Sequence, residues 1–410
     1  MLYEPKACRA CAKAKRKCGK ELPACLRCRS RGVVCDYPPT RPGTFVAVLD
    51  DSPIQQILTP QSTPTTLYST TSLPSINAPP VSATDRPCLA WFLDANSWKV
   101  DHQEASLSTS YCNTFLKLYV TRLQEWVDQW ASRGACPFIH SRLYIARFPD
   151  CLQIAMMTQT TYRNRTLQNT DLILKIVEDQ ASKLVDEAIQ NGCDPALSLS
   201  LLDQMARLHA LVIYQTISLF DGDIRTRHLA EARLPLLSRW AQQLLESARQ
   251  KFSSTPAVLD MTVALHLGPM DSEEHPWYLW ILTESIRRTW LIAGGLEAIY
   301  SMLQRGWHPC PGGIMFTTRQ GIWDAPSALA WEESCFARGK TPESVGFIHR
   351  FETSRLFQTS TPDDIDDFTD LMMEITYGAE RMHKWKQENR QSRDRDNAAN
   401  GSINGNVPAT

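Results

Sequence analysis

The chain has 410 residues, of which 43% are hydrophobic, and a net charge of −1. This length allows two or three domains. No apolar run approaches the ~20 residues that a membrane span needs, and no signal segment opens the chain, so we expect an intracellular protein in a reducing compartment. The charge is uneven, because residues 1–42 carry a net of +8 and the remainder −9. A basic head on an acidic body is typical of a polyanion-binding module joined to a part that does not bind polyanions.

Six of the 13 cysteines form two copies of one unit, a C-x2-C pair followed six residues later by a third cysteine. They are Cys8, Cys11, Cys18, Cys25, Cys28 and Cys35. Thiolates at this spacing are metal ligands, and zinc takes four of them in a tetrahedron. Two zinc ions need eight ligand positions, which six cysteines fill only if two thiolates bridge both ions. Two separate sites would leave each ion one ligand short, and the segment holds no histidine.

Residues 1–38 contain too few apolar side chains to build a hydrophobic core. Metal must therefore supply the folding energy, of order 10 kcal/mol for structural zinc. We expect a small zinc-stabilised cluster domain with two short helices, one beginning within each C-x2-C pair. The loop between them holds Pro23.

The cysteine pattern, the basic run Lys13 to Lys17 and Pro23 resemble the DNA-binding domain of the fungal binuclear zinc cluster transcription factors. The resemblance covers roughly residues 7–38. It implies that Cys8 and Cys25 bridge the two zinc ions and that Lys15 contacts bases. It also implies double-stranded DNA with G·C-rich, CGG-like half-sites as the partner. The family often has Arg or Lys at two positions where this chain has Ala12 and Ala14.

The basic residues around Lys15 are expected to position the domain on DNA through phosphate contacts. These residues are Lys13, Arg16, Lys17, Lys20, Arg27 and Arg29. Lys15 can donate to guanine O6 and N7 in the major groove.

Residues 39–87 are rich in Ser, Thr and Pro, which predicts a disordered linker. Dimerisation stays possible, but prolines interrupt every candidate heptad there, so no coiled coil is predicted. Residues 88–388 are predicted to form an all-α regulatory domain, and residues 389–410 a disordered tail.

Two helices of this region stand out by their apolar periodicity. One has Leu172, Ile173, Ile176, Val177, Leu184, Val185, Ala188 and Ile189 on one face and stops at Asn191-Gly192. The other carries Leu279, Leu282, Ile286, Trp290 and Ala293, with Glu284 and Arg288 as a weak surface pair.

The acidic and apolar stretch Pro362 to Ile375 has two interpretations. It resembles an activation segment that folds on a coactivator. It also fits an amphipathic helix with Thr361 as N-cap, Pro362 in the first position and Ile365, Phe368, Leu371, Met372 and Ile375 on one face.

The nine histidines are dispersed, and we find no phosphate loop or nucleophile elbow, so the sequence does not predict an enzyme. It predicts a nuclear, zinc-dependent, sequence-specific transcription factor at RNA polymerase II promoters. The resemblance implies that it works with the transcription machinery on a metabolic or secondary-metabolite gene set. The alternative is a zinc-stabilised scaffold or interaction protein in which the helical body is the functional part.

Overall fold

The computed structural model describes residue 11, residues 13–14, 16–19, 25–33 and 35, and then 89–103, 113–191, 199–253, 274–337 and 345–403. The chain divides into two compact units, residues 1–79 and 80–410, and each is described by itself. The predicted linker at 39–87 lies outside the described residues.

The N-terminal unit contains the short helix α2, Leu26–Ser30. This helix begins inside the second C-x2-C pair, as expected, with Cys25 in the N-cap position. The chain then turns through Gly32, whose φ of 61° favours glycine. Leu26 and Val33 are 65% and 51% exposed. The buried side chains of the described part of this unit are cysteines, which agrees with a fold that depends on metal.

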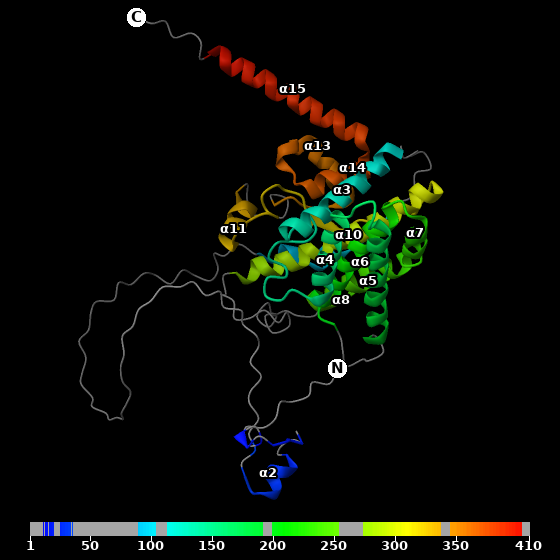
Figure 1. Cartoon of the computed structure of the whole chain (residues 1–410). Helices are drawn as coiled ribbons and strands as arrows, with labels where there is room; N and C mark the ends of the chain where they lie inside the picture. Colours follow the sequence, from blue (N-terminus) through cyan, green and yellow to red (C-terminus); the bar gives the residue numbers. More distant parts are fainter. Residues whose placement is uncertain are drawn as a thin grey trace, which may run out of the picture. The chain divides into compact units, whose positions relative to one another are not determined.

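The second unit is mostly helical, which confirms the predicted fold class (Figure 1). Its α-helices are α3 (Asn113–Arg133), α4 (Asp150–Arg163), α5 (Thr170–Asn191), α6 (Leu201–Phe220), α7 (Ile224–Glu231), α8 (Leu234–Ser253), α10 (His275–Arg305), α11 (Ala328–Phe336), α13 (Leu356–Thr359), α14 (Asp367–Tyr377) and α15 (Ala379–Ile403). Short 3-10 helices are η1 (Leu89–Leu93), η2 (Ala95–Trp98), η4 (Arg350–Arg355) and η5 (Pro362–Asp364). Two three-residue strands, β1 (Met315–Thr317) and β2 (Phe347–His349), pair antiparallel.

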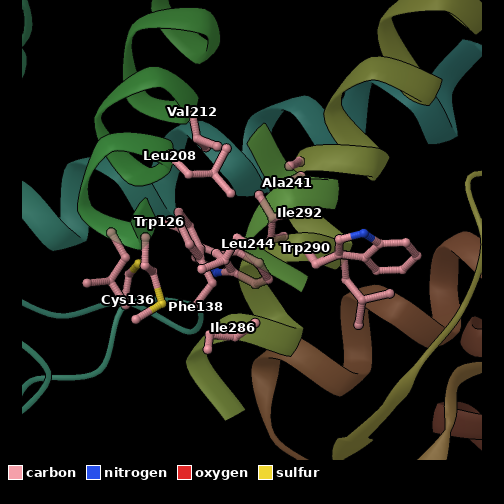
Figure 2. Close-up of a cluster of buried hydrophobic side chains, with 14 of the residues drawn as sticks. Trp126, Cys136, Phe138, Leu208, Val212, Ala241, Leu244, Ile286, Trp290 and Ile292 are labelled. Carbon is pink, nitrogen blue, oxygen red and sulfur yellow. The ribbon is translucent and has the colours of Figure 1, made fainter. Parts of the chain in front are cut away.

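Helices α6 and α10 run through the core, because both are apolar around most of their circumference. α10 packs against α3, α6 and α8. It has Pro276 in its first turn and ends at Gly306, whose φ is 78°. Figure 2 shows side chains from these four helices and from the loop after α3 meeting in the interior. Those labelled are Trp126, Cys136, Phe138, Leu208, Val212, Ala241, Leu244, Ile286, Trp290 and Ile292.

Helix α5 ends at Asn191, as its sequence predicts, but its buried face differs from the predicted one. The buried side chains are Ile173, Leu174, Val177, Ala181 and Leu184. Leu172 and Ile189 are more than 60% exposed. The buried stripe is narrow because α5 packs along a single seam against α4 and α6. Apolar residues at the border of the predicted face therefore remain in solvent.

The predicted surface pair between Glu284 and Arg288 is wrong, because both side chains are 0% exposed. The Arg288 guanidinium contacts Glu284 at 3.0 Å and Asp366 at 2.7 Å. It also donates to the carbonyl oxygens of Pro137 and Thr317, each at 2.9 Å. One cation thus joins α10 to the loop after α3, to β1 and to the start of α14. Sequence spacing identified the pair but carried no information about what covers it.

The stretch from Pro362 forms two elements instead of the one predicted helix. Thr361 and Asp364 form a capping box on η5, and the chain is extended at Ile365. Helix α14 then begins at Asp367, and the Asp366 side chain caps it by accepting from the Thr369 N–H. The break arises because Asp366 is held by buried Arg288. Phe368, Leu371 and Met372 lie in the main core, which favours the packed-helix interpretation over an exposed activation segment.

Helix α15 continues to Ile403, past residue 389, where we predicted the tail to begin. It docks through Met382 and Trp385 onto a small second core with Leu356, Ile365 and Met373. Among the described residues, no helix combines the length and apolarity needed to cross a membrane.

Two histidines are buried in neutral form. His209 lies between the Tyr144 hydroxyl at 2.9 Å and Thr289 Oγ1 at 2.6 Å, and burial lowers its pKa to about 3. His140 Nδ1 accepts from the Arg142 N–H, and burial again lowers the pKa to about 3.

We predict that Arg288→Met lowers the free energy of unfolding by about 3–5 kcal/mol, because it leaves Glu284 and Asp366 buried without their cation. Urea unfolding of the full chain followed by tryptophan fluorescence measures this, since all 12 tryptophans lie outside the cysteine segment. The matched control is Arg249→Met, which removes a 62% exposed arginine from an ion pair and should change stability by less than ~0.5 kcal/mol. Equal effects of the two substitutions would contradict the structural role of Arg288.

We predict that stability falls between pH 7 and pH 5. The unfolded histidines bind protons below their usual pKa of 6.5, whereas the buried ones stay neutral until about pH 3. At pH 5 each of the two buried histidines therefore lowers the free energy of unfolding by about 2 kcal/mol. His209→Gln should therefore show a smaller loss over this range than the wild type. His228→Gln, which changes an 83% exposed histidine, should keep the wild-type slope. A His209→Gln slope identical to that of the wild type would contradict the assignment.

Candidate metal centre and nucleic-acid interface

The sulfur atoms of Cys11, Cys25 and Cys28 lie within 4.8 Å of one another, and all three side chains are buried. Cys11 comes from the first C-x2-C pair, and Cys25 and Cys28 form the second. Cys18 and Cys35 pack against this group, and the Cys35 sulfur accepts from the Cys25 N–H at 3.3 Å. The structure therefore brings five of the six predicted ligands together, while Cys8 lies outside the described residues.

The geometry of these thiols fits zinc. Two sulfur ligands on one tetrahedral zinc, each about 2.3 Å from the ion, lie about 3.8 Å apart. The Cys11 and Cys25 sulfur atoms are 3.7 Å apart. Soft thiolate donors also suit zinc by their chemistry. The predicted bridging pair of Cys8 and Cys25 stays a prediction, since only Cys25 is described.

The surroundings of Cys25 favour the thiolate that a metal requires. Interaction with the backbone N–H of Cys28 lowers the pKa of the Cys25 thiol, while burial works in the opposite direction. The thiols of Cys28, Cys11 and Cys18 lower it further. A thiolate, not a thiol, is the form that binds metal.

Three thiols of the helical unit differ from that of Cys25. Burial raises the pKa of Cys136 and Cys335 to about 12 and that of Cys151 to about 11. Among the described residues, Cys11, Cys25 and Cys28 are the one group of three or more His, Cys, Asp or Glu side chains with ligand atoms this close. The described part of the body therefore contains no comparable cluster.

Most of the described basic side chains of the N-terminal unit are exposed, in contrast to the buried thiols. Lys13, Arg16, Lys17 and Arg29 are exposed, and Arg27 is half-buried in α2. The Arg16 N–H donates to the Cys11 carbonyl at 3.1 Å, which fixes the backbone of the basic run next to the cluster. Lys15 and Lys20 lie outside the described residues, so their predicted contacts stay predictions.

Arg31 is an exposed cation that the sequence analysis left out of the interface. It follows directly on α2 in the C-cap position. The alternation of arginine at 27, 29 and 31 was the signal that could have identified it.

Comparisons with known proteins agree with this geometry. The sequence model of the fungal Zn(2)-Cys(6) binuclear cluster domain matches residues 6–43. The transcription factor gsfR2 of Penicillium aethiopicum is 27% identical over 93% of this chain and 94% of its own length. The Trypacidin cluster transcription factor of Aspergillus fumigatus is 58% identical over 9% of this chain and 10% of its own.

The Pestheic acid cluster transcriptional regulator 2 of Pestalotiopsis fici is 58% identical over 8% of this chain and 7% of its own length. No solved structure matches the chain. The short alignments span only about as many residues as the cysteine motif, whereas the first relative is similar along nearly the whole chain. The chain thus carries a fungal Zn(2)-Cys(6) binuclear cluster domain, which binds two zinc ions, and it is similar along nearly its whole length to a fungal transcription factor.

Proposed function

We propose that this chain is a nuclear, sequence-specific DNA-binding transcription factor that acts at RNA polymerase II promoters and controls a set of secondary-metabolite genes. The observation that carries the proposal is the group of buried thiols in a strongly basic unit. Two of the similar proteins are named as regulators of the trypacidin and pestheic acid clusters, which supports a metabolite gene set. The proposal includes no catalytic step.

Cys8, Cys11, Cys18, Cys25, Cys28 and Cys35 are the proposed ligands of the two zinc ions, with Cys8 and Cys25 bridging. Bound zinc supplies the folding energy that the unit's few apolar side chains cannot. The thiol distances described above support this assignment, since they fit shared tetrahedral ions. The basic segment is then held as one rigid surface.

Phosphate contacts from Lys13, Arg16, Lys17, Lys20, Arg27 and Arg29 would fix the orientation of the unit on double-stranded DNA. Lys15 would donate to guanine O6 and N7 within a CGG-like half-site. The exposure of the described cations supports this division, because exposed side chains are accessible to the DNA backbone. The helical body would couple DNA occupancy to the transcription machinery.

We predict that the zinc-loaded full chain holds two zinc ions and that Cys25→Ser loses at least one, because Cys25 lies between ligands of both halves. Colorimetric zinc release from the denatured protein measures the stoichiometry. Cys151→Ser is the matched control, since Cys151 lies in the helical unit with a pKa of about 11, and it should keep both ions. Retention of two zincs by Cys25→Ser would exclude Cys25 as a shared ligand.

We predict that Lys15→Ala weakens binding to a CGG-containing duplex by roughly 1–3 kcal/mol and leaves binding to a scrambled duplex unchanged. Lys13→Ala should weaken binding to both duplexes alike, as expected for a phosphate contact. It should also reduce by about 1 the magnitude of the slope of log K against log salt concentration. Fluorescence anisotropy of the zinc-loaded full chain across salt concentrations measures both effects. Arg249→Ala, on the helical unit, is the control and should bind as the wild type does.

Equal losses by Lys15→Ala on the two duplexes would remove Lys15 from base recognition. A reporter assay distinguishes a transcription factor from the alternative function, a zinc-stabilised scaffold protein. A chain with Lys13, Lys15, Arg16 and Lys17 neutralised should lose reporter control if it is a transcription factor. A scaffold would keep its function.

A further inference from the structure

The helical unit contains a cavity of about 310 Å3 at a corner formed by α4, α5, α6 and the loop before α4. Apolar groups from Phe148, Leu184, Ala188 and Leu199 line it. Its volume is at the lower end of the range for small-molecule sites, which are concave and mostly apolar with a few fixed polar groups. The residues that line the cavity belong to the helical unit, whereas the proposed zinc ligands and DNA contacts belong to the N-terminal unit.

Arg207 of α6 lines this cavity and is half-buried. Its guanidinium carbon lies 4.3 Å from the centroid of the Trp240 ring, a stacking arrangement that orients the group. The Nε atom is buried, and the described residues offer it no hydrogen-bond partner. Burial lowers the pKa of Arg207, and an electrostatic interaction with Cys151 acts in the opposite direction. The guanidinium nevertheless stays charged at neutral pH, because its usual pKa is above 12.

The other charged groups around the cavity already have partners or are hydrated. Arg147 pairs with Asp203. Asp150 and Asp203 lie in the first turns of α4 and α6, where the helix N-termini stabilise negative charge. Glu187 is exposed, so water screens it. Cys151 is a neutral thiol, since burial raises its pKa to about 11.

We propose that this cavity binds a small organic acid, whose carboxylate or acidic phenolate pairs with Arg207 and whose apolar ring system lies between α4, α5 and α6. A partly desolvated cation without a counter-ion is costly, and a bound anion would remove that cost through charge-assisted hydrogen bonds. The apolar walls supply the remaining binding energy. This proposal goes beyond DNA binding and does not depend on it.

The competing explanation is that Arg207 serves packing alone, through its stack on Trp240. Charge specificity separates the two. An acid and its neutral amide have nearly the same shape, so a cavity that merely accepts apolar rings would bind both equally. A cavity that uses Arg207 as a counter-ion would prefer the acid.

The test is isothermal titration calorimetry on the zinc-loaded full chain with 2-naphthoate and with 2-naphthamide, its neutral isostere. We expect 2-naphthoate to bind the wild type at least tenfold more tightly than 2-naphthamide. Arg207→Gln should weaken 2-naphthoate at least tenfold and leave 2-naphthamide unchanged. Ala188→Phe, which fills the cavity and keeps Arg207, should weaken both ligands.

Arg249→Gln is the matched control, an exposed arginine of the same unit, and should bind 2-naphthoate as the wild type does. Tryptophan-detected melting shows whether each variant is folded. If Arg207→Gln does not fold, the acid–amide comparison on the wild type and the Ala188→Phe result decide the proposal. It is overturned if acid and amide bind equally, if folded Arg207→Gln keeps wild-type affinity, or if benzoate, 2-naphthoate and 9-anthroate all fail to bind. None of these outcomes involves DNA, so they are distinguishable from failure of the proposed function.

Discussion

The N-terminal unit depends on bonds between thiolates and metal, because its described interior consists of cysteine side chains. Cys11, Cys25 and Cys28 are buried together while Leu26 and Val33 face solvent. In an apolar core, removing one side chain leaves a cavity that neighbours partly fill. Here each lost ligand opens a coordination position, and the thiolates left behind repel one another. Folding and metal binding are therefore one equilibrium, and the basic side chains acquire fixed positions only when that equilibrium lies on the folded side.

The body is held together differently, by a wide apolar core that also encloses charged side chains, among them Glu284, Arg287 and Arg288. Arg288 satisfies two carboxylates and two carbonyl oxygens without contact with water. Such a group contributes little net stability compared with an apolar replacement of both partners, but it penalises any arrangement in which one partner is missing. It thereby fixes where α14 starts relative to α10 and β1. This explains why the acidic stretch after Pro362 breaks at Asp366 instead of forming one continuous helix.

The sequence predicted local features better than tertiary ones. The cysteine spacing identified the metal centre because six thiols within 28 residues have few other uses. Periodicity likewise located α5, whose described residues extend to Asn191, where the Asn-Gly pair predicts a stop. Periodicity located α10 but could not show that Glu284 and Arg288 point inward, because a charged pair at i and i+4 has the same pattern on a surface. The exposed Leu172 and the buried Leu174 show the same limit. Which edge of an apolar stripe is covered depends on neighbours that come from other parts of the chain.

Arg207 and Arg288 are the same residue type on neighbouring core helices, α6 and α10, and their surroundings differ in a way that bears on role. Each of the three guanidinium nitrogens of Arg288 donates to an oxygen of the protein, and the group stacks on Trp323. Arg207 stacks on Trp240 and lines the cavity between α4, α5 and α6, and its buried Nε finds no acceptor among the described residues. A packing role alone would be met by an apolar side chain at lower desolvation cost. A charged side chain at this position is explained if an anion from solution binds in the cavity and accepts hydrogen bonds from Arg207. This is the physical basis for proposing that the cavity binds an anion.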